Sequence, residues 1–543
     1  MDTNYDTVAE DSLLKSNKKR QVLPQTDAVI DSSRASLPWV EGIILFVLVL
    51  TALVPRIILA HQLDLVTDEI IYIMGGKIYF PLLLHLLITS NQWLFNYEHP
   101  PVVKLLIGLA LYLNAHLGSH LSELFAARIP SVLSGTGLIV ATYLLGRGPF
   151  GRIVALLAAL CLALSPWLVY FSALAYLDMT MTALITIAYL ILWPAIRQPR
   201  LYLLSALLMG LGIACKYTAV LALPGMFFFI AYYFIAIRPR LDIKQRPPVP
   251  WNWWLTALLL IPVTFFIADP AIWQHPYSLL LQSVLFEWHH SITGHLTFLA
   301  GQYGEHAPRW AVLYIIFAKL SIFVTLPAVF FLVYSVIQLV RFHLKRANLS
   351  ITEVSSIAYL SIWLISIVSM FSLLNIVVGT HYHLPLVPPV GLAGAYGIIA
   401  LIRFISKAFQ VSDVNTVSHI YEETASASPV MTGRRRIKIR SLVVLAVLFV
   451  LFVGPHLLGL LTNYAAYHTS WYSYNRGIQG RLTYSEVQPT STSFPFDYLV
   501  WPMHLIQRGF AIPEAWRSHV VHMIMGGHTI YCFILANTPA TIT

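Results

Sequence analysis

Two adjacent carboxylates, Asp68 and Glu69, follow the first long apolar stretch of the chain. Adjacent carboxylates beside a membrane are costly to desolvate, and their repulsion can raise the pKa of one of them toward the range of a general base. Tyr72 and Tyr79 follow a short distance downstream. The pair therefore indicates a base for a hydroxyl nucleophile, although a solvated pair of loop carboxylates fits the local pattern equally well.

A second acidic motif, Glu98-His99-Pro100-Pro101, stands shortly before Lys104. The two prolines fix the entry to a helix, because a proline ring suits the first helical turn, and they place Glu98 and His99 just before it. The same pattern is also that of a plain helix start. The motif by itself therefore leaves both interpretations open.

Further polar side chains stand at the ends of apolar runs. They are Asp178, Lys216, His289, His290, His295, His381 and His383. A single histidine or lysine at such a boundary is more often a structural anchor than a functional group. Only a shared location would give these residues a joint chemical role.

The elements that must position them are membrane helices. Among 543 residues, 57% are hydrophobic and only 11% are charged, against about 25% charged in an ordinary soluble domain. Apolar runs of about 20 residues recur along the chain. The formal net charge of +10 comes from lysines and arginines between these runs, which indicates membrane topology and not a nucleic-acid partner.

Charge and span length predict an all-α polytopic membrane protein. Residues 1–38 form a basic cytoplasmic tail, residues 39–461 a membrane domain with about eleven crossings, and residues 462–543 a small external C-terminal domain. Residues 61–128 and 269–310 form the large outer loops. Within the first loop, the apolar stretches at 78–88 and 102–113 suit juxtamembrane helices that lie in the interface.

This topology places the candidate polar residues on one face of the membrane. Transport would instead favour charges near mid-membrane or duplicated halves, and neither is evident in the sequence. A carboxylate base and separate cationic groups at an interface suit attack on a phosphate-activated substrate whose lipid tail stays in the bilayer. A transporter or flippase, and a noncatalytic scaffold, are the alternatives from other classes.

These motifs resemble the protein O-mannosyltransferase and aminoarabinose transferase-like family of GT-C glycosyltransferases. The matching features also include Ala127-Arg128-Ile129-Pro130-Ser131 and His381-Tyr382-His383-Leu384-Pro385. The resemblance implies a GT-C bundle that transfers a sugar, expected to be mannose, from a polyprenyl-phosphate carrier to an acceptor hydroxyl. The transfer would invert the configuration of the sugar. The same resemblance implies a protein Ser/Thr acceptor, with a glycolipid acceptor as the alternative.

The resemblance also implies residue roles. Asp68 is the expected base and Glu69 helps to hold the acceptor. Lys216 with His381 or His383 would neutralise the departing phosphate. Contacts with the sugar or support of the pocket are expected from Glu98, His99 and Asp178. The expected acceptor or pocket residues are Tyr72, His289, His290 and Arg128.

The expected partners are the polyprenyl-phosphate sugar, a protein or glycolipid acceptor, and membrane lipids. Glu98, Asp178 and the histidines could also bind a divalent metal, but no spacing is diagnostic of one. Many bacterial relatives carry Arg-Tyr where this chain has His381-Tyr382, so phosphate contact there would be weaker. The short external tail favours a prokaryotic plasma membrane, with the endoplasmic reticulum as the location in a eukaryote.

Overall fold

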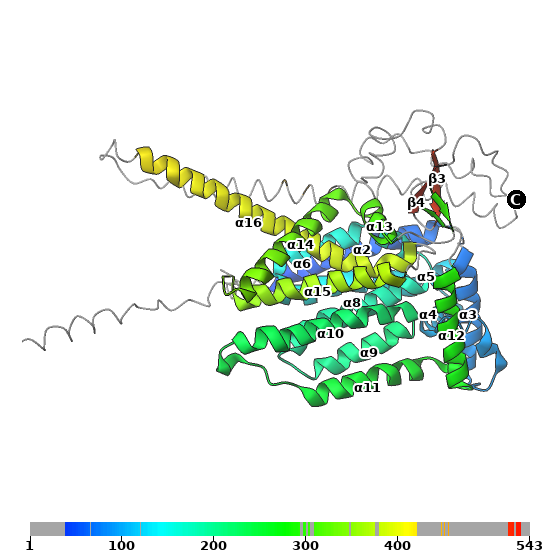
Figure 1. The fold of residues 1–543 in the computed structure, drawn as a ribbon. Coiled ribbons are helices and arrows are strands. Elements are labelled where there is room, and N and C mark those ends of the chain that lie inside the picture. The colour runs from blue at the N-terminus through cyan, green and yellow to red at the C-terminus, as the bar shows by residue number, and fades with distance from the viewer. Residues whose placement is uncertain are drawn as a thin grey trace, which may run out of the picture. The chain divides into compact units, whose positions relative to one another are not determined.

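A computed structural model of the chain describes fourteen stretches of it. They are residues 38–63, 65, 67–119, 121–293, 297–299, 302–304, 309–346, 349–374, 380–420, 447, 450, 454, 520–525 and 528–533. The chain divides into two compact units, residues 1–47 and 48–543. The described part of the first unit is the start of a helix, and the second unit holds the helical bundle (Figure 1).

The described elements are almost all helices, some of them 3-10 or π turns, and the two β-hairpins are short. In chain order they are α2 (Pro38–Gln62), α3 (Thr67–Leu84), η1 (Asn91–Leu94), α4 (Val102–His116), α5 (Glu123–Phe150), α6 (Arg152–Leu164), α7 (Pro166–Ser172), α8 (Leu177–Ala195), α9 (Leu201–Ile213), η2 (Tyr217–Ala222), α10 (Leu223–Tyr232), η3 (Tyr233–Ile237), η4 (Arg238–Arg240), η5 (Ile243–Gln245), α11 (Trp251–Ala268), η6 (Pro270–Ile272), α12 (Pro276–Thr293), β1 (Thr297–Leu299), β2 (Gln302–Gly304), α13 (Ala311–Lys319), α14 (Ile322–His343), α15 (Ile351–Leu374), η7 (Thr380–Leu386), α16 (Val387–Ile420), β3 (Val520–Met525) and β4 (His528–Phe533). The all-α membrane fold class is therefore confirmed.

The candidate spans agree with the hydropathy of the sequence. Within the described residues, eight helices are long and apolar enough to cross a membrane, and nine if the bent pair α6 and α7 counts as one span. The long apolar stretch around Lys216 is divided, because the shorter apolar helix α9 ends before this residue and a span from Tyr217 to Arg240 follows it. The end of the predicted membrane domain, residues 442–461, lies largely outside the described residues, so the total of eleven crossings stays a prediction.

A buried arginine accompanies the break between α6 and α7. The two helices meet at an angle of 61°, where Ser165 and Pro166 interrupt the hydrogen-bond ladder and leave carbonyl oxygens without helical partners. The Arg56 guanidinium, fully buried on α2, donates to the carbonyl oxygens of Ala163 at 3.0 Å and Leu162 at 3.4 Å. This membrane-embedded charge therefore has a structural task, and the sequence analysis did not identify it.

The centre of the bundle is α8, which packs against α5 and α9. Most of its side chains are buried. Its Tyr189 stacks on Trp363 of α15, with ring centroids 4.4 Å apart. The hydroxyls of Tyr189 and Tyr359 each donate to the other residue's carbonyl oxygen, at 2.9 and 2.5 Å. These reciprocal bonds satisfy two polar groups inside an apolar bundle, where unpaired groups would be costly.

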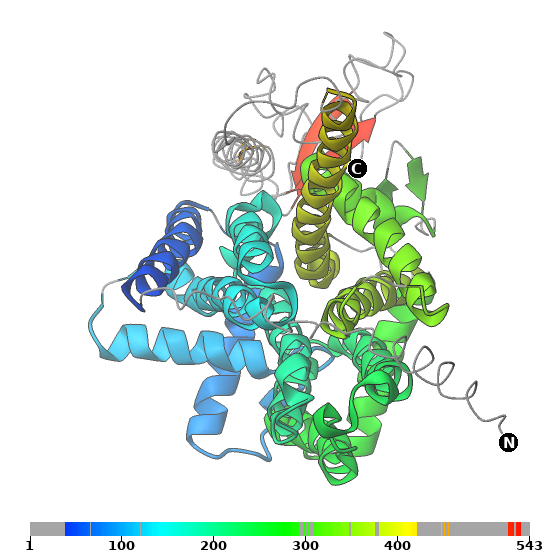
Figure 2. The same ribbon diagram turned by 90° about the vertical axis from the view of Figure 1, so that its left-hand side faces the viewer.

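Helices α3 and α4 lie across one end of the bundle (Figures 1 and 2). They approach closely because glycines face each other, and a Cβ atom added at Gly108 would overlap the carbonyl oxygen of Gly76. The predicted helix at 78–88 has different bounds, since α3 begins at Thr67 and ends at Leu84. Asp68 and Glu69 form its first turn, where the helix dipole favours negative charge.

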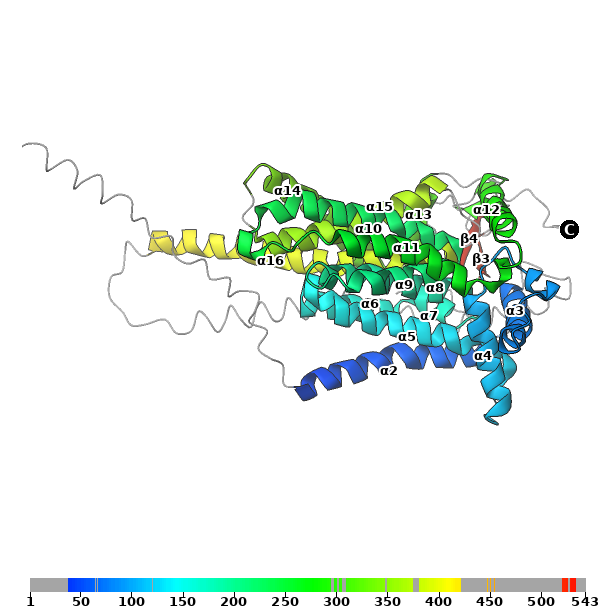
Figure 3. The same ribbon diagram turned by 90° about the horizontal axis from the view of Figure 1, so that it is seen from below.

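Helix α12 occupies the same end of the bundle as α3 and α4 (Figure 3). It is the longest element of the predicted outer loop at 269–310, and Gln274, just before it, contacts the first outer loop. The Gln274 amide donates to the carbonyl oxygens of Ile88 at 3.1 Å and Ser90 at 3.0 Å. Of the predicted C-terminal domain, only the hairpin β3–β4 lies within the described residues.

Candidate active site

Glu69 and Arg128 form a closed ion pair beneath the start of α3. Both side chains are 0% exposed. Arg128 Nε donates to Glu69 Oε1 at 2.8 Å and Arg128 Nη2 to Glu69 Oε2 at 2.6 Å, a bidentate arrangement. The Ala175 N–H also donates to Oε1, and Arg128 Nη1 to the carbonyl oxygens of Ala60 and Leu63. Neither residue has a side-chain surface that a substrate could reach, so the geometry gives both a positioning task.

Asp68, the adjacent residue, points elsewhere and is only partly buried. Its carboxylate accepts a hydrogen bond from the Tyr176 hydroxyl. Burial raises the pKa of Asp68 above its usual value, and the Asp178 charge adds to this effect, while Lys216, Tyr176 and His99 oppose it. A carboxylate with a raised pKa and a reachable surface has the properties of a general base.

Lys216 and Asp178 form a second buried ion pair. Both charges act on Asp68, and these three residues with the side chains around them form one polar cluster. Lys216 Nζ lies 2.7 Å from Asp178 Oδ1, and the two side chains are 1% and 0% exposed. Burial alone would lower the pKa of Lys216, but the Asp178 carboxylate outweighs it, so the pKa lies above its usual value. The ammonium lies 3.5 Å from the centroid of the Tyr382 ring. The Asp178 carboxylate therefore favours the charged form of Lys216 at this position.

Asp178 keeps one oxygen for another partner. Its Oδ2 atom is buried and has no hydrogen-bond partner among the described residues. Lys216 likewise has three donor hydrogens but one carboxylate contact. The pair is therefore incomplete, unlike the pair of Glu69 with Arg128.

Aromatic rings connect η7 with this cluster. The His381 ring lies 5.4 Å from the Tyr176 ring and 5.7 Å from the Phe171 ring. Tyr72 lies 5.9 Å from Tyr176 in an edge-on arrangement. His383 is fully buried, and its ring packs 5.8 Å from Phe371. The structure thus brings His381 and Tyr72 to the cluster, whereas the ring of His383 packs against Phe371 of α15.

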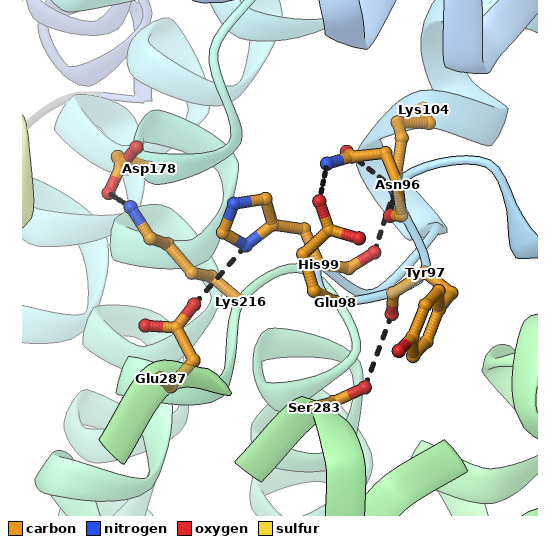
Figure 4. A network of polar contacts seen from close by, with 9 residues as sticks. All are labelled: Asn96, Tyr97, Glu98, His99, Lys104, Asp178, Lys216, Ser283 and Glu287. Atoms are coloured by element: carbon orange, nitrogen blue, oxygen red, sulfur yellow. Dashed lines mark hydrogen bonds and ion pairs between the residues drawn. The ribbon is translucent and has the colours of Figure 1, made fainter. Parts of the chain in front are cut away.

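Lys104 holds the segment that contains the Glu98-His99 motif. Its fully buried ammonium donates to the carbonyl oxygen of Asn96 at 2.6 Å, to Asn96 Oδ1 at 3.1 Å and to the carbonyl oxygen of His99 at 2.7 Å. Asn96 Nδ2 in turn donates to Glu98 Oε1 at 2.6 Å (Figure 4). Glu98 is thus bound within its own turn, and His99 projects from a loop that Lys104 fixes.

A buried carboxylate, Asp269, lies near the same lysine. Burial raises the pKa of Asp269 to about 7, although Lys104 and the Ala271 backbone N–H oppose the shift. Burial also lowers the pKa of Lys104 to about 7, against the opposing effects of Asp269 and Glu98. Asp269 follows α11 directly, so this interaction links the second outer segment to the first.

Glu287 of α12 is a site residue that the sequence analysis missed. Its Oε1 atom lies 3.2 Å from His99 Nδ1, and the two side chains are 13% and 14% exposed. In Figure 4 a dashed line joins Glu287 to the His99 ring, and the side chains of Lys216 and Asp178 lie to the left of that ring. No sequence motif marks Glu287, and the one sequence signal that could have identified it is that it is the single acidic residue of α12.

The remaining predicted site residues lie apart or cannot be placed. His289 is exposed on α12, and the side chain of His290 lies outside the described part. Among the described residues, no three or more His, Cys, Asp or Glu side chains are grouped as metal ligands. The arrangement instead offers a carboxylate base, a buried cation and partly buried hydroxyl-binding groups within one cluster.

The central part of the chain matches a family model. Residues 98–266 match the model described as dolichyl-phosphate-mannose-protein mannosyltransferase. The matched part includes the Glu98-His99 motif, Arg128, Asp178 and Lys216. Compared with curated protein sequences, the chain matches none.

Two solved proteins are similar to the chain. ArnT from Cupriavidus metallidurans bound to undecaprenyl phosphate aligns with a TM-score of 0.46 at 16% identity, over 81% of this chain and 75% of ArnT. The archaeal oligosaccharyltransferase AglB from Archaeoglobus fulgidus, in complex with an inhibitory peptide and a dolichol-phosphate, aligns with a TM-score of 0.42 at 12% identity, over 83% of this chain and 60% of AglB. The resemblance to the dolichyl-phosphate-mannose-protein mannosyltransferase family, which the motifs indicate, is confirmed by the family model over residues 98–266.

Proposed function

We propose that the chain is a GT-C glycosyltransferase that moves a sugar from a polyprenyl-phosphate carrier to an acceptor hydroxyl. Mannose is the sugar that we propose. The reaction would take place at the non-cytoplasmic face of the membrane, with the N-terminus in the cytoplasm. The observation that supports this most is the location of Asp68, a partly exposed carboxylate with a raised pKa, in one cluster with the Lys216 cation. The family match over residues 98–266 supports the donor class.

The proposed reaction is a single displacement. The acceptor oxygen attacks C1 of the sugar, and its proton passes to the Asp68 carboxylate. The bond between C1 and the phosphate oxygen breaks, and the polyprenyl phosphate leaves with the bonding electrons. The configuration at C1 is therefore inverted. Because a phosphate is a good leaving group, the chief task of the site is to stabilise its charge.

Lys216 is the cation that we assign to this task. Its ammonium has donor hydrogens beyond the one that binds Asp178, and its charge lies close enough to influence His381. Asp178 keeps the lysine charged in a buried position. His381, which replaces the arginine of many bacterial relatives, would contribute a hydrogen bond but no permanent charge.

Glu69 and Arg128 would position the base instead of contacting the acceptor. Their closed pair fixes the first turn of α3 and hence the direction of the Asp68 side chain. Tyr72, one turn further along α3, is buried at 6% exposure and borders the cluster. A role of His289 and His290 on the acceptor side stays part of the proposal, although His289 is exposed on α12.

The acceptor is proposed to be a protein Ser or Thr hydroxyl. A glycolipid hydroxyl is the alternative, and both would require the same base. A prokaryotic plasma membrane remains the proposed location. The mannose donor and the protein acceptor follow the description of the matched family.

The test is sugar transfer by the purified protein in lipid, with a panel of polyprenyl-phosphate sugars and both acceptor classes. We expect Asp68→Asn to lower the transfer rate by about 10²–10⁴-fold, the usual contribution of a general base. The matched control is Glu123→Gln, an exposed carboxylate paired with Lys77, which should leave the rate unchanged. Full transfer by a folded Asp68→Asn protein would refute the proposed mechanism.

A further inference from the structure

The burial pattern of helix α12 is inverted relative to that of a soluble helix. Leu285, Phe286 and Trp288 are 53%, 44% and 55% exposed. Glu287, which stands among them, has a side chain only 13% exposed. Withdrawing a carboxylate from water is costly unless it has polar partners. The orientation of α12 therefore puts apolar side chains outward and directs one charge into the cluster.

Helix α12 is attached to the first outer segment beside this charge. The Tyr97 hydroxyl donates to Gln282 Oε1 at 3.0 Å, and the Ser283 hydroxyl lies 3.4 Å from the Tyr97 carbonyl oxygen. The Phe286 ring lies edge-on to the His99 ring at 6.4 Å. These contacts determine where Glu287 lies relative to His99. The two side chains together form one wall of the site, which we call the Glu287–His99 wall.

This wall borders the proposed donor site. The Glu287 charge lies close enough to influence Lys216 and Tyr72. Tyr72 in turn lies edge-on to His99, with ring centroids 6.2 Å apart. A carboxylate repels a phosphate, so Glu287 suits the uncharged part of a donor whose phosphate lies at Lys216.

We infer that Glu287 and His99 bind the sugar hydroxyls of the donor and select a neutral hexose. Two carboxylate oxygens can accept hydrogen bonds from neighbouring hydroxyls, and an imidazole nitrogen can donate or accept one more. A sugar that carries a carboxylate would meet the Glu287 charge and bind poorly. This inference rests on the proposed function, since it names the part of the donor that this wall contacts.

The test compares Glu287→Gln with the unaltered protein in two assays. Direct binding is measured for polyprenyl-phosphate hexose and for bare polyprenyl phosphate, and transfer is measured with hexose and hexuronate donors. We expect the variant to bind the hexose donor about 10–100-fold more weakly, the loss typical of a hydrogen bond to a charged group. Its affinity for bare polyprenyl phosphate should not fall, and its discrimination against the hexuronate should diminish.

Two further variants separate recognition from folding. Glu287→Asp keeps the charge and should recover part of the affinity, and Glu123→Gln on α5 serves as the carboxylate control. If Glu287→Gln lowers the thermal midpoint, His99→Gln is measured in its place and should show the same selective loss.

The outcomes are distinct for the two proposals. A variant that loses turnover while its affinity for the hexose donor is unchanged would overturn the inference, and so would equal losses for hexose donor and bare carrier. If the unaltered protein transfers no sugar from any donor, the proposed function fails. The binding comparison still decides in that case whether this wall recognises sugar.

Discussion

Two buried ion pairs in this protein differ in how completely their atoms are satisfied. Arg128 donates two hydrogen bonds to the Glu69 carboxylate. The Ala175 N–H donates a further bond to Glu69, and Arg128 also donates to the carbonyl oxygens of Ala60 and Leu63. Asp178 and Lys216 share one contact of 2.7 Å, and Asp178 Oδ2 has no hydrogen-bond partner among the described residues. Both pairs are hidden from solvent. Their difference therefore lies in bonding and not in burial.

The comparison separates a structural pair from one that can take a ligand. A buried polar group that lacks a partner is costly, and such groups in native proteins usually have a specific explanation. The pair of Glu69 with Arg128 needs nothing further and fixes the chain. The pair of Asp178 with Lys216 retains hydrogen-bonding capacity next to the Asp68 carboxylate, which is where a phosphate-linked substrate is proposed to bind.

The largest expected effect is a loss of stability when the pair of Glu69 with Arg128 is broken. Arg128→Met would leave the Glu69 charge buried without its partner, which typically costs about 3–5 kcal/mol of stability. We expect a large fall in the thermal midpoint of the purified protein and loss of activity in proportion to unfolding. Arg147→Met, a change at a more exposed position of the same helix, is the control. An unchanged midpoint in Arg128→Met would contradict the structural assignment of this pair.

The next effect concerns the incomplete pair. Lys216→Met removes the proposed phosphate contact, and loss of one such contact in a transition state typically costs about 10²–10³-fold in kcat. Transfer rate and donor affinity are measured together, with Lys77→Met on the exposed part of α3 as the control. Were transfer by a folded Lys216→Met protein to match the unaltered rate, Lys216 would have no part in stabilising the leaving group.

The smallest effect is a displacement of the pH profile. Asp68 acts as a base only when it is deprotonated, so kcat/KM should fall as the pH drops through its pKa. The groups that influence Asp68 are Lys216, Tyr176, His99 and Asp178, and only Asp178 raises its pKa by charge. Asp178→Asn should therefore lower the pKa of Asp68 and move the acidic limb to lower pH.

The pH experiment has a matched control in Asp242→Asn, at an exposed position far from α3 in sequence. Its acidic limb should coincide with that of the unaltered protein. A limb that stays in place in Asp178→Asn would show that a group other than Asp68 governs the profile. The Asp68 assignment would then have to be abandoned.

Much of the fold could be predicted because the bilayer imposes simple requirements. A crossing helix needs a long apolar run with its backbone bonded internally, so hydropathy predicted a bundle of membrane-spanning helices, which the described residues show. The bounds of α3 differed from the prediction. Its apolar stretch is visible in the sequence, whereas the contribution of Asp68 and Glu69 to its first turn depends on contacts with α5 and the segment before α8.

The sequence alone determined the class of the protein, its spans and a set of polar residues suited to phosphate chemistry. Only the tertiary structure decided that Asp68 reaches the cluster while Glu69 is bound to Arg128, 59 residues away. It also decided that Glu287 faces His99 and that Arg56 serves the break between α6 and α7. The physical reason is that an apolar run enters the membrane because of its own hydrophobicity. The role of a charged side chain instead depends on partners that come from distant parts of the chain.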